Sequence, residues 1–169
     1  GNGFGAISQL TDNDTVDLMP TVFGNENNIS VAWVSQSNNN LFETASANTV
    51  KVKSITESSS IQSYAQAEEI DGICGAYING EMHIAYSAGN ERETKEVYLD
   101  NNRLTNNEVI DSKPCFDGNC LYWYSDGGII EYNIQTAEKK NIIEGREAIT
   151  NDRFDILSDD SGNRSIVFE

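Results

Sequence analysis

The chain repeats one short pattern four times, an aromatic-rich strand that follows a tight turn. The aromatic segments recur at intervals of roughly 40 residues, which is typical of propeller blades built from several short strands. In three of the four, a glycine lies six residues before the aromatic residue. The pairs are Gly80 with Tyr86, Gly118 with Tyr124 and Gly162 with Phe168, while Trp33 follows a turn-rich run over 24–28. The repeat predicts an all-β fold in which one hairpin recurs.

The spacing divides the chain into four repeat units of a single domain. The units run over about 9–53, 54–101, 102–141 and 142–169, and residues 3–8 are expected to complete the last unit. Pairing the two termini in this way would close a four-bladed β-propeller without an open sheet edge. A fragment of a larger propeller, or two copies that form a larger ring, fits the same pattern.

Within a unit the expected order is strand, turn, aromatic strand, polar turn, strand. Aromatic strands are expected over 29–35, 82–86 and 120–125, and the strands after them over 41–45, 96–99 and 129–134. Asn-Gly and Asp-Gly pairs at 79–80 and 117–118 are the strongest hairpin signals. No helix is expected, because the helix-forming stretches at 64–69 and 136–141 are too short and fit a turn or an outer strand better.

The third unit holds two of the three cysteines, Cys115 and Cys120. If Asp117 and Gly118 form a two-residue type I′ turn, these cysteines face each other across the hairpin. Directly opposed residues of this kind come close enough for a cross-strand disulfide. The alternative is a pair of small buried thiols, which is the expectation for Cys74. A disulfide would indicate an oxidising compartment.

The charge of the chain restricts its partners. Its 27 acidic and 11 basic residues give a net charge of −16. Nucleic acid and anionic membranes are therefore disfavoured as partners, because their negative charges repel a negatively charged protein. No apolar run approaches the roughly 20 residues needed to span a bilayer, so no membrane insertion is expected.

Two segments resemble the TolB-type β-propeller repeat: LTNNEVIDSKPCFDGNCLYWYSD in the third unit and LTDNDTVDLMPTVFGNENNISVAWVS in the first. Both read Leu-Thr, then Pro and Phe, then a turn and an aromatic strand that ends in Ser. The fourth unit matches in part and the second only at its hairpin. The resemblance implies a propeller that serves as a docking platform, a ligand-binding disc or a gating domain of a hydrolase.

Candidate site residues are acidic. Asp71, Asp111 and Asp155 are expected just before the first hairpin strand of their units, near a ring end where ligands bind. Asp12, Asp14 and Asp17 offer oxygen ligands for calcium, although their spacing departs from the EF-hand loop and a solvated acidic loop is the alternative. No other cofactor is expected. No catalytic residue is assigned, because the lone His83 lies inside an expected strand and no zinc spacing occurs.

These observations favour a non-enzymatic binding or protein-interaction domain of a secreted or surface-attached bacterial protein. Its ligand would be a protein or a carbohydrate, and an open ring would self-associate. The alternatives are a propeller glycosidase or lyase with carboxylates in a central channel, or the regulatory propeller of a larger peptidase.

Overall fold

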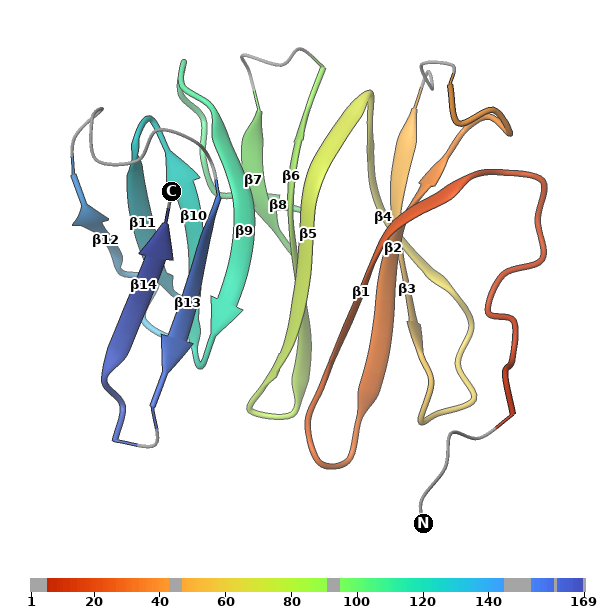
Figure 1. The fold of residues 1–169 in the computed structure, drawn as a ribbon, viewed down its shortest axis with the longest axis horizontal. Coiled ribbons are helices and arrows are strands. Elements are labelled where there is room, and N and C mark those ends of the chain that lie inside the picture. Colours follow the sequence, from red (N-terminus) through yellow and green to blue (C-terminus); the bar gives the residue numbers. More distant parts are fainter. Residues whose placement is uncertain (1–5, 43–46, 91–94, 145–152, 160, 169) are drawn as a thin grey trace.

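The protein is all-β. A computed structural model describes residues 6–42, 47–90, 95–144, 153–159 and 161–168, which contain fourteen strands and no helix. The strands form three four-stranded antiparallel sheets and one two-stranded sheet, and every sheet follows the order of the chain. Figure 1 shows the four sheets side by side along the long axis of the molecule.

Sheet A contains β1 (Asp17–Gly24), β2 (Ile29–Gln36), β3 (Asn48–Ser54) and β4 (Gln62–Ala67). Sheet B contains β5 (Glu69–Ile78), β6 (Glu81–Gly89), β7 (Glu96–Leu99) and β8 (Asn102–Arg103). Sheet C contains β9 (Asp111–Asp117), β10 (Cys120–Ser125), β11 (Gly128–Asn133) and β12 (Lys139–Ile143). Sheet D contains β13 (Phe154–Ser158) and β14 (Arg164–Phe168).

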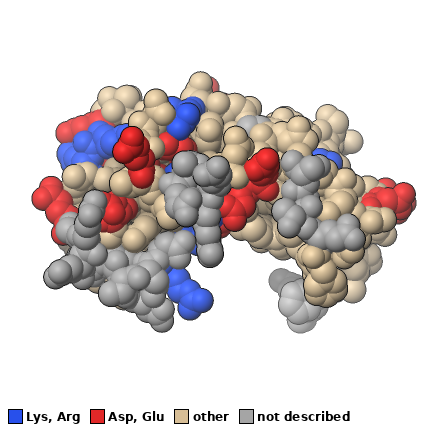
Figure 2. Space-filling view, turned by 90° about the horizontal axis from the view of Figure 1, so that it is seen from above, with Lys and Arg blue, Asp and Glu red and all other residues tan. Residues whose placement is uncertain are grey.

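The core consists of three apolar layers, one between each pair of consecutive sheets. Side chains such as Phe23, Val34 and Tyr86 fill the space between sheets A and B. Trp123 packs between sheets B and C, and Ile156 packs between sheets C and D. The first strands β1, β5, β9 and β13 contact one another in succession. Seen from above, the molecule is an arc that is hollowed on one side (Figure 2).

The predicted aromatic strands are confirmed. Trp33, Tyr86, Trp123 and Phe168 lie on β2, β6, β10 and β14, the second strands of their sheets. The apolar run of β10 is buried on both faces, because Leu121, Tyr122 and Trp123 are all at most 1 % exposed. The stretches at 64–69 and 136–141 fall mainly in a turn or in the outer strands β4 and β12, as expected.

Three strand predictions differ from the structure. The strand expected over 41–45 is wrong where it is described: Leu41 and Phe42 lie in a turn, residues 43–46 fall outside the described ranges, and β3 begins at Asn48. Sheet A also extends through β4, which the spacing had grouped with the second unit. Of residues 3–8, residues 6–8 form no strand and residues 3–5 lie outside the described part. The described N-terminal segment leads into sheet A, at the opposite end of the arc from sheet D (Figure 1).

The turn between β9 and β10 is shifted by one residue from its predicted position. Asp117 pairs with Cys120, so Gly118 and Asn119 form the loop. Gly118 has φ +57°, and a glycine at the first central position is what a type II′ turn requires. Cys115 therefore lies opposite Tyr122, and the predicted direct pairing of Cys115 with Cys120 is wrong. All three cysteines are free in the structure.

Arg164 fastens sheet D to sheet C. Its guanidinium forms an ion pair with Glu131 and lies 5.7 Å from the centre of the Tyr122 ring. Ser158, on the other strand of the hairpin, donates a hydrogen bond to Asp117. These polar contacts supplement the small apolar layer around Ile156.

Candidate functional site

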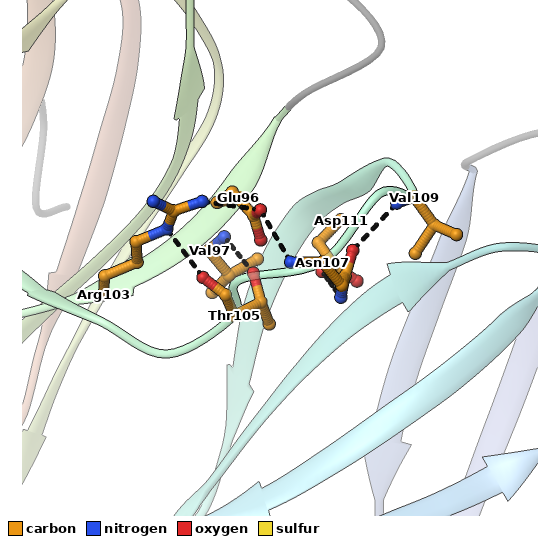
Figure 3. A network of polar contacts seen from close by, with 7 residues as sticks. All are labelled: Glu96, Val97, Arg103, Thr105, Asn107, Val109 and Asp111. Atoms are coloured by element: carbon orange, nitrogen blue, oxygen red, sulfur yellow. Dashed lines mark hydrogen bonds and ion pairs between the residues drawn. The ribbon is translucent and has the colours of Figure 1, made fainter.

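A buried carboxylate, Glu96, stands at the start of β7 and is only 2 % exposed. Its Oε1 atom accepts a hydrogen bond from Arg103 Nη2 at 2.7 Å and another from the Asn107 backbone N–H at 3.0 Å (Figure 3). Arg103 also donates through Nε to the carbonyl of Thr105. The Glu96–Arg103 pair is therefore held in place by the loop that leads from β8 to β9.

The other oxygen of this carboxylate, Oε2, is buried and has no hydrogen-bond partner among the described residues. An unsatisfied buried acceptor costs about 1–3 kcal/mol, and more when the group is charged. Native proteins pair nearly all such atoms, so an unpaired one calls for an explanation. A ligand that donates a hydrogen bond to Oε2 would supply the missing partner.

A cavity of about 250 Å³ adjoins Glu96, between β4 of sheet A and strands β6, β7 and β8 of sheet B. Tyr86 and Tyr98 line it, with their rings stacked at 5.2 Å between centroids and 4° between planes. Arg103 lies at the wall with a side chain that is 45 % exposed. The exposed amide side chains of Gln66 and Asn90 lie at the rim. The site thus combines an aromatic wall with hydrogen-bond donors and acceptors.

The same loop carries a second buried acid, Asp111. Asn107, which binds Glu96 through its backbone, donates through Nδ2 to Asp111 Oδ2 at 2.8 Å (Figure 3). Trp123 Nε1 donates to the other oxygen at 3.2 Å. Asp111 is completely buried and both of its oxygens have partners. It therefore holds the loop against sheet C rather than facing a ligand.

The three predicted ligand-binding acids lie inside the first strands, not before them. Asp71 accepts hydrogen bonds from Ser87 and Lys95, whose side chain is only 7 % exposed. Asp155 is exposed on β13, and its Oδ1 accepts the backbone N–H of Ile156. Asp71 and Asp111 thus have neighbouring side chains as partners, whereas the carboxylate of Asp155 faces solvent.

The three acids of the predicted calcium loop differ in exposure and in hydrogen bonding. Asp12 and Asp14 are exposed, whereas Asp17 is half-buried and accepts a hydrogen bond from Trp33 Nε1 at 3.1 Å. Within the described ranges, no group of three or more His, Cys, Asp or Glu side chains is placed to hold a metal ion. Calcium at this loop stays a prediction from the sequence.

The cysteines and the single histidine lie in packed surroundings. Burial, and then the charges of Asp155 and Asp117, raise the pKa of the Cys115 thiol to about 12. Burial also raises the pKa of Cys74 well above its usual value. The ring of His83 is 15 % exposed and contacts Asp100 Oδ2 through Nδ1 at 2.7 Å.

Sequence reasoning missed Glu96. The only local signal is a charged residue at the head of the apolar strand Glu-Val-Tyr-Leu, a pattern that many exposed strand ends share. Its burial depends on sheet A and on the loop that follows β8, and neither is visible in its own neighbourhood.

Comparison with known proteins adds no relative. A scan against protein-family models and searches of curated proteins and of solved structures find no match to the chain. None of the described residues belongs to a helix that is long and apolar enough to span a membrane.

Proposed function

We propose that the protein is a non-enzymatic binding domain whose four sheets are propeller blades, and that it holds a small ligand in the cavity beside Glu96. The contacts between successive first strands and the arc-shaped outline support the propeller assignment, as does the resemblance of two repeats to TolB-type propellers. The observation that carries the binding role is the buried, unpartnered Oε2 of Glu96 next to a cavity.

The charges around the cavity favour an uncharged ligand. A cation would meet the guanidinium of Arg103 at the same wall, and an anion would meet Glu96 in a chain of net charge −16. A hydroxyl group in the cavity can donate to the carboxylate of Glu96, and a neighbouring hydroxyl can accept from Arg103. Tyr98, which is partly exposed and stacks on the buried ring of Tyr86, offers the aromatic face on which a sugar ring packs.

The size of the cavity fits a single sugar unit. Its volume of about 250 Å³ lies just below the range of about 300–1,000 Å³ that is typical of sites for drug-sized ligands. It far exceeds the roughly 30 Å³ that one water molecule takes up in the liquid. The ligand class is therefore a neutral monosaccharide, or the end of a glycan on a secreted or surface-attached partner.

The test is a titration monitored by amide NMR shifts with three probes that share one ring: glucose, glucosamine and glucuronate. We expect millimolar binding for the neutral sugar, weaker binding for both charged sugars, and shifts centred on β7 and the loop over 104–110. Galactose and mannose are titrated in parallel with glucose, because a single hydrogen-bond acceptor does not select one arrangement of the sugar hydroxyls.

The matched variants are Glu96→Gln and Glu108→Gln, because Glu108 is an exposed acid on the same loop. Glu96→Gln should weaken sugar binding about tenfold, equivalent to about 1.4 kcal/mol, whereas Glu108→Gln should bind like the wild type. Thermal unfolding of both variants controls for folding. If no neutral sugar shifts the amides around Glu96, or if Glu96→Gln binds as well as Glu108→Gln, the proposal fails.

A further inference from the structure

The internal contact between sheets B and C shows how one sheet docks on the next. Trp123 of sheet C packs on Val97 and Leu99 of sheet B. The segment just before sheet C joins this contact, because Leu104 donates its backbone N–H to the carbonyl of Val97 at 2.8 Å. Thr105 Oγ1 accepts the Val97 N–H at 2.9 Å. A Leu-Thr pair and a tryptophan on the second strand therefore form the docking surface for the preceding sheet.

Sheet A has the same docking surface, but no sheet of the described residues packs on it. Trp33 Nε1 donates to the first residue of β1 just as Trp123 Nε1 donates to the first residue of β9. Leu10 and Thr11 stand where Leu104 and Thr105 stand in the later unit, and they line an apolar cavity of about 150 Å³ together with Trp33. Val22, opposite Val31 on this face, is 68 % exposed. Trp33 and Val31 are themselves only 4 % and 8 % exposed, and residues such as Leu10 and Thr11 lie against them. No other sheet of the described chain packs on the Trp33 face.

The other end of the arc carries a face of the complementary kind. One face of sheet D packs on sheet C through Ile156 and Ile166. Leu157 and Val167 alternate with these residues along the two strands and are each 65 % exposed. They form the outward face of sheet D, to which Asp155 also belongs because it pairs with Val167.

The two end faces also complement each other in charge. Lys51 pairs with Trp33 and Lys53 pairs with Val31, so both lysines lie on the Trp33 face of sheet A. The outward face of sheet D presents the exposed Asp155. Although acidic residues outnumber basic ones 27 to 11, two lysines lie on the face that no other described sheet covers.

We propose that two copies of this chain associate head to tail, with the outward face of sheet D of one copy on the Trp33 face of the other. Two such contacts, related by a twofold axis, close a ring in which every sheet has a neighbour on both sides. A second copy is the occupant because both halves of the contact, apolar and charged, belong to this one sequence.

The first measurement is the mass of the whole chain in solution by light scattering over a range of concentrations. We expect a dimer, twice the 18.6 kDa of one chain. Val167→Glu and Val22→Glu should each give monomers, because they place an acid in opposite halves of the same contact. Phe42→Glu changes a residue that is 94 % exposed and lies in a turn after β2 rather than on the strands of these faces, and it should remain dimeric.

A mixture of the two monomeric variants tests the head-to-tail arrangement of the dimer. A mixed dimer of Val167→Glu with Val22→Glu keeps one of its two contacts intact, so association should return in part. Asp155→Lys reverses the charge of an exposed side chain and should weaken the dimer severalfold. The proposal is overturned if the wild type is monomeric at high concentration, if the mixture does not recover, or if species larger than a dimer accumulate.

Discussion

At the scale of single residues, the same tryptophan–aspartate hydrogen bond occurs twice with different burial. Trp33 donates to Asp17 and Trp123 donates to Asp111, and each aspartate is the first residue of its sheet. Asp111 is completely buried, whereas Asp17 is half-buried at an open end of the arc. A comparison of these two hydrogen bonds therefore shows how burial changes the contribution of the same contact to stability.

Replacing Asp111 by alanine should destabilise the fold more than the same change at Asp17. The change at Asp111 leaves the buried Trp123 N–H without a partner and also removes the hydrogen bond from the exposed Asn107, so it should lower the free energy of unfolding by about 3 kcal/mol. Asp17→Ala should cost about 1 kcal/mol, since water can replace its carboxylate. Urea unfolding of both variants measures the difference. Equal losses would show that the two contacts do not differ in burial as described.

The cysteine thiols should be unreactive in the native protein. Only the thiolate attacks an alkylating reagent, and the pKa of Cys115 is raised to about 12. Cys74, whose pKa is also raised, should behave in the same way. Cys120 is only 3 % exposed, so the reagent cannot reach it in the folded protein. Iodoacetamide at about pH 8 should therefore label all three cysteines only after denaturation. A mass that falls short of three labels without reductant, and reaches three with it, would instead show the Cys115–Cys120 disulfide that the sequence suggested.

At the scale of elements, the sheets approach most closely where glycine removes a side chain. A Cβ atom at Gly75 on β5 would lie 2.5 Å from the ring of Phe23 on β1. One at Gly72 would lie 2.9 Å from Pro114 on β9. These two glycines set the spacing of sheet B from sheets A and C.

Gly75→Ala should destabilise the contact between sheets A and B by about 1–3 kcal/mol, the usual effect of overpacking a core. Phe23→Leu replaces the opposing ring with a smaller side chain that leaves room for the new methyl group. The double variant should therefore lose less free energy of unfolding than the sum of the losses of the two single variants. A double-mutant cycle measured by thermal or urea unfolding gives this coupling. Strictly additive effects would mean that the two side chains do not meet.

The hairpins show how far element-level prediction from sequence extends. Glycines at 80, 118 and 162 all adopt positive φ in their turns, as the spacing predicts. The register across the third hairpin was still displaced by one residue, because glycine at 118 suits the first central position of a II′ turn as well as the second position of an I′ turn. Turn composition locates a hairpin without choosing its register.

At the scale of the whole molecule, the net charge of −16 opposes compaction. Raising sodium chloride from about 10 mM to about 500 mM should screen this repulsion and raise the melting temperature. Calcium and magnesium chloride at equal ionic strength provide the control for the acidic loop. An equal rise with both ions indicates screening alone, whereas a larger rise with calcium that Asp14→Asn removes would support calcium at Asp12, Asp14 and Asp17.

Local sequence patterns predict the all-β class, the four aromatic strands and the glycine turns before three of them, because these features depend on neighbours a few residues apart. They do not fix the register of the third hairpin. Only the packed structure shows which of the described acids is buried without a full set of partners. Glu96 acquires its cavity from β4 of another sheet and its partners from a later loop. The repeat likewise did not reveal that, among the described residues, no sheet packs on Trp33 as sheet B packs on Trp123, since contacts between sheets join residues far apart in the chain.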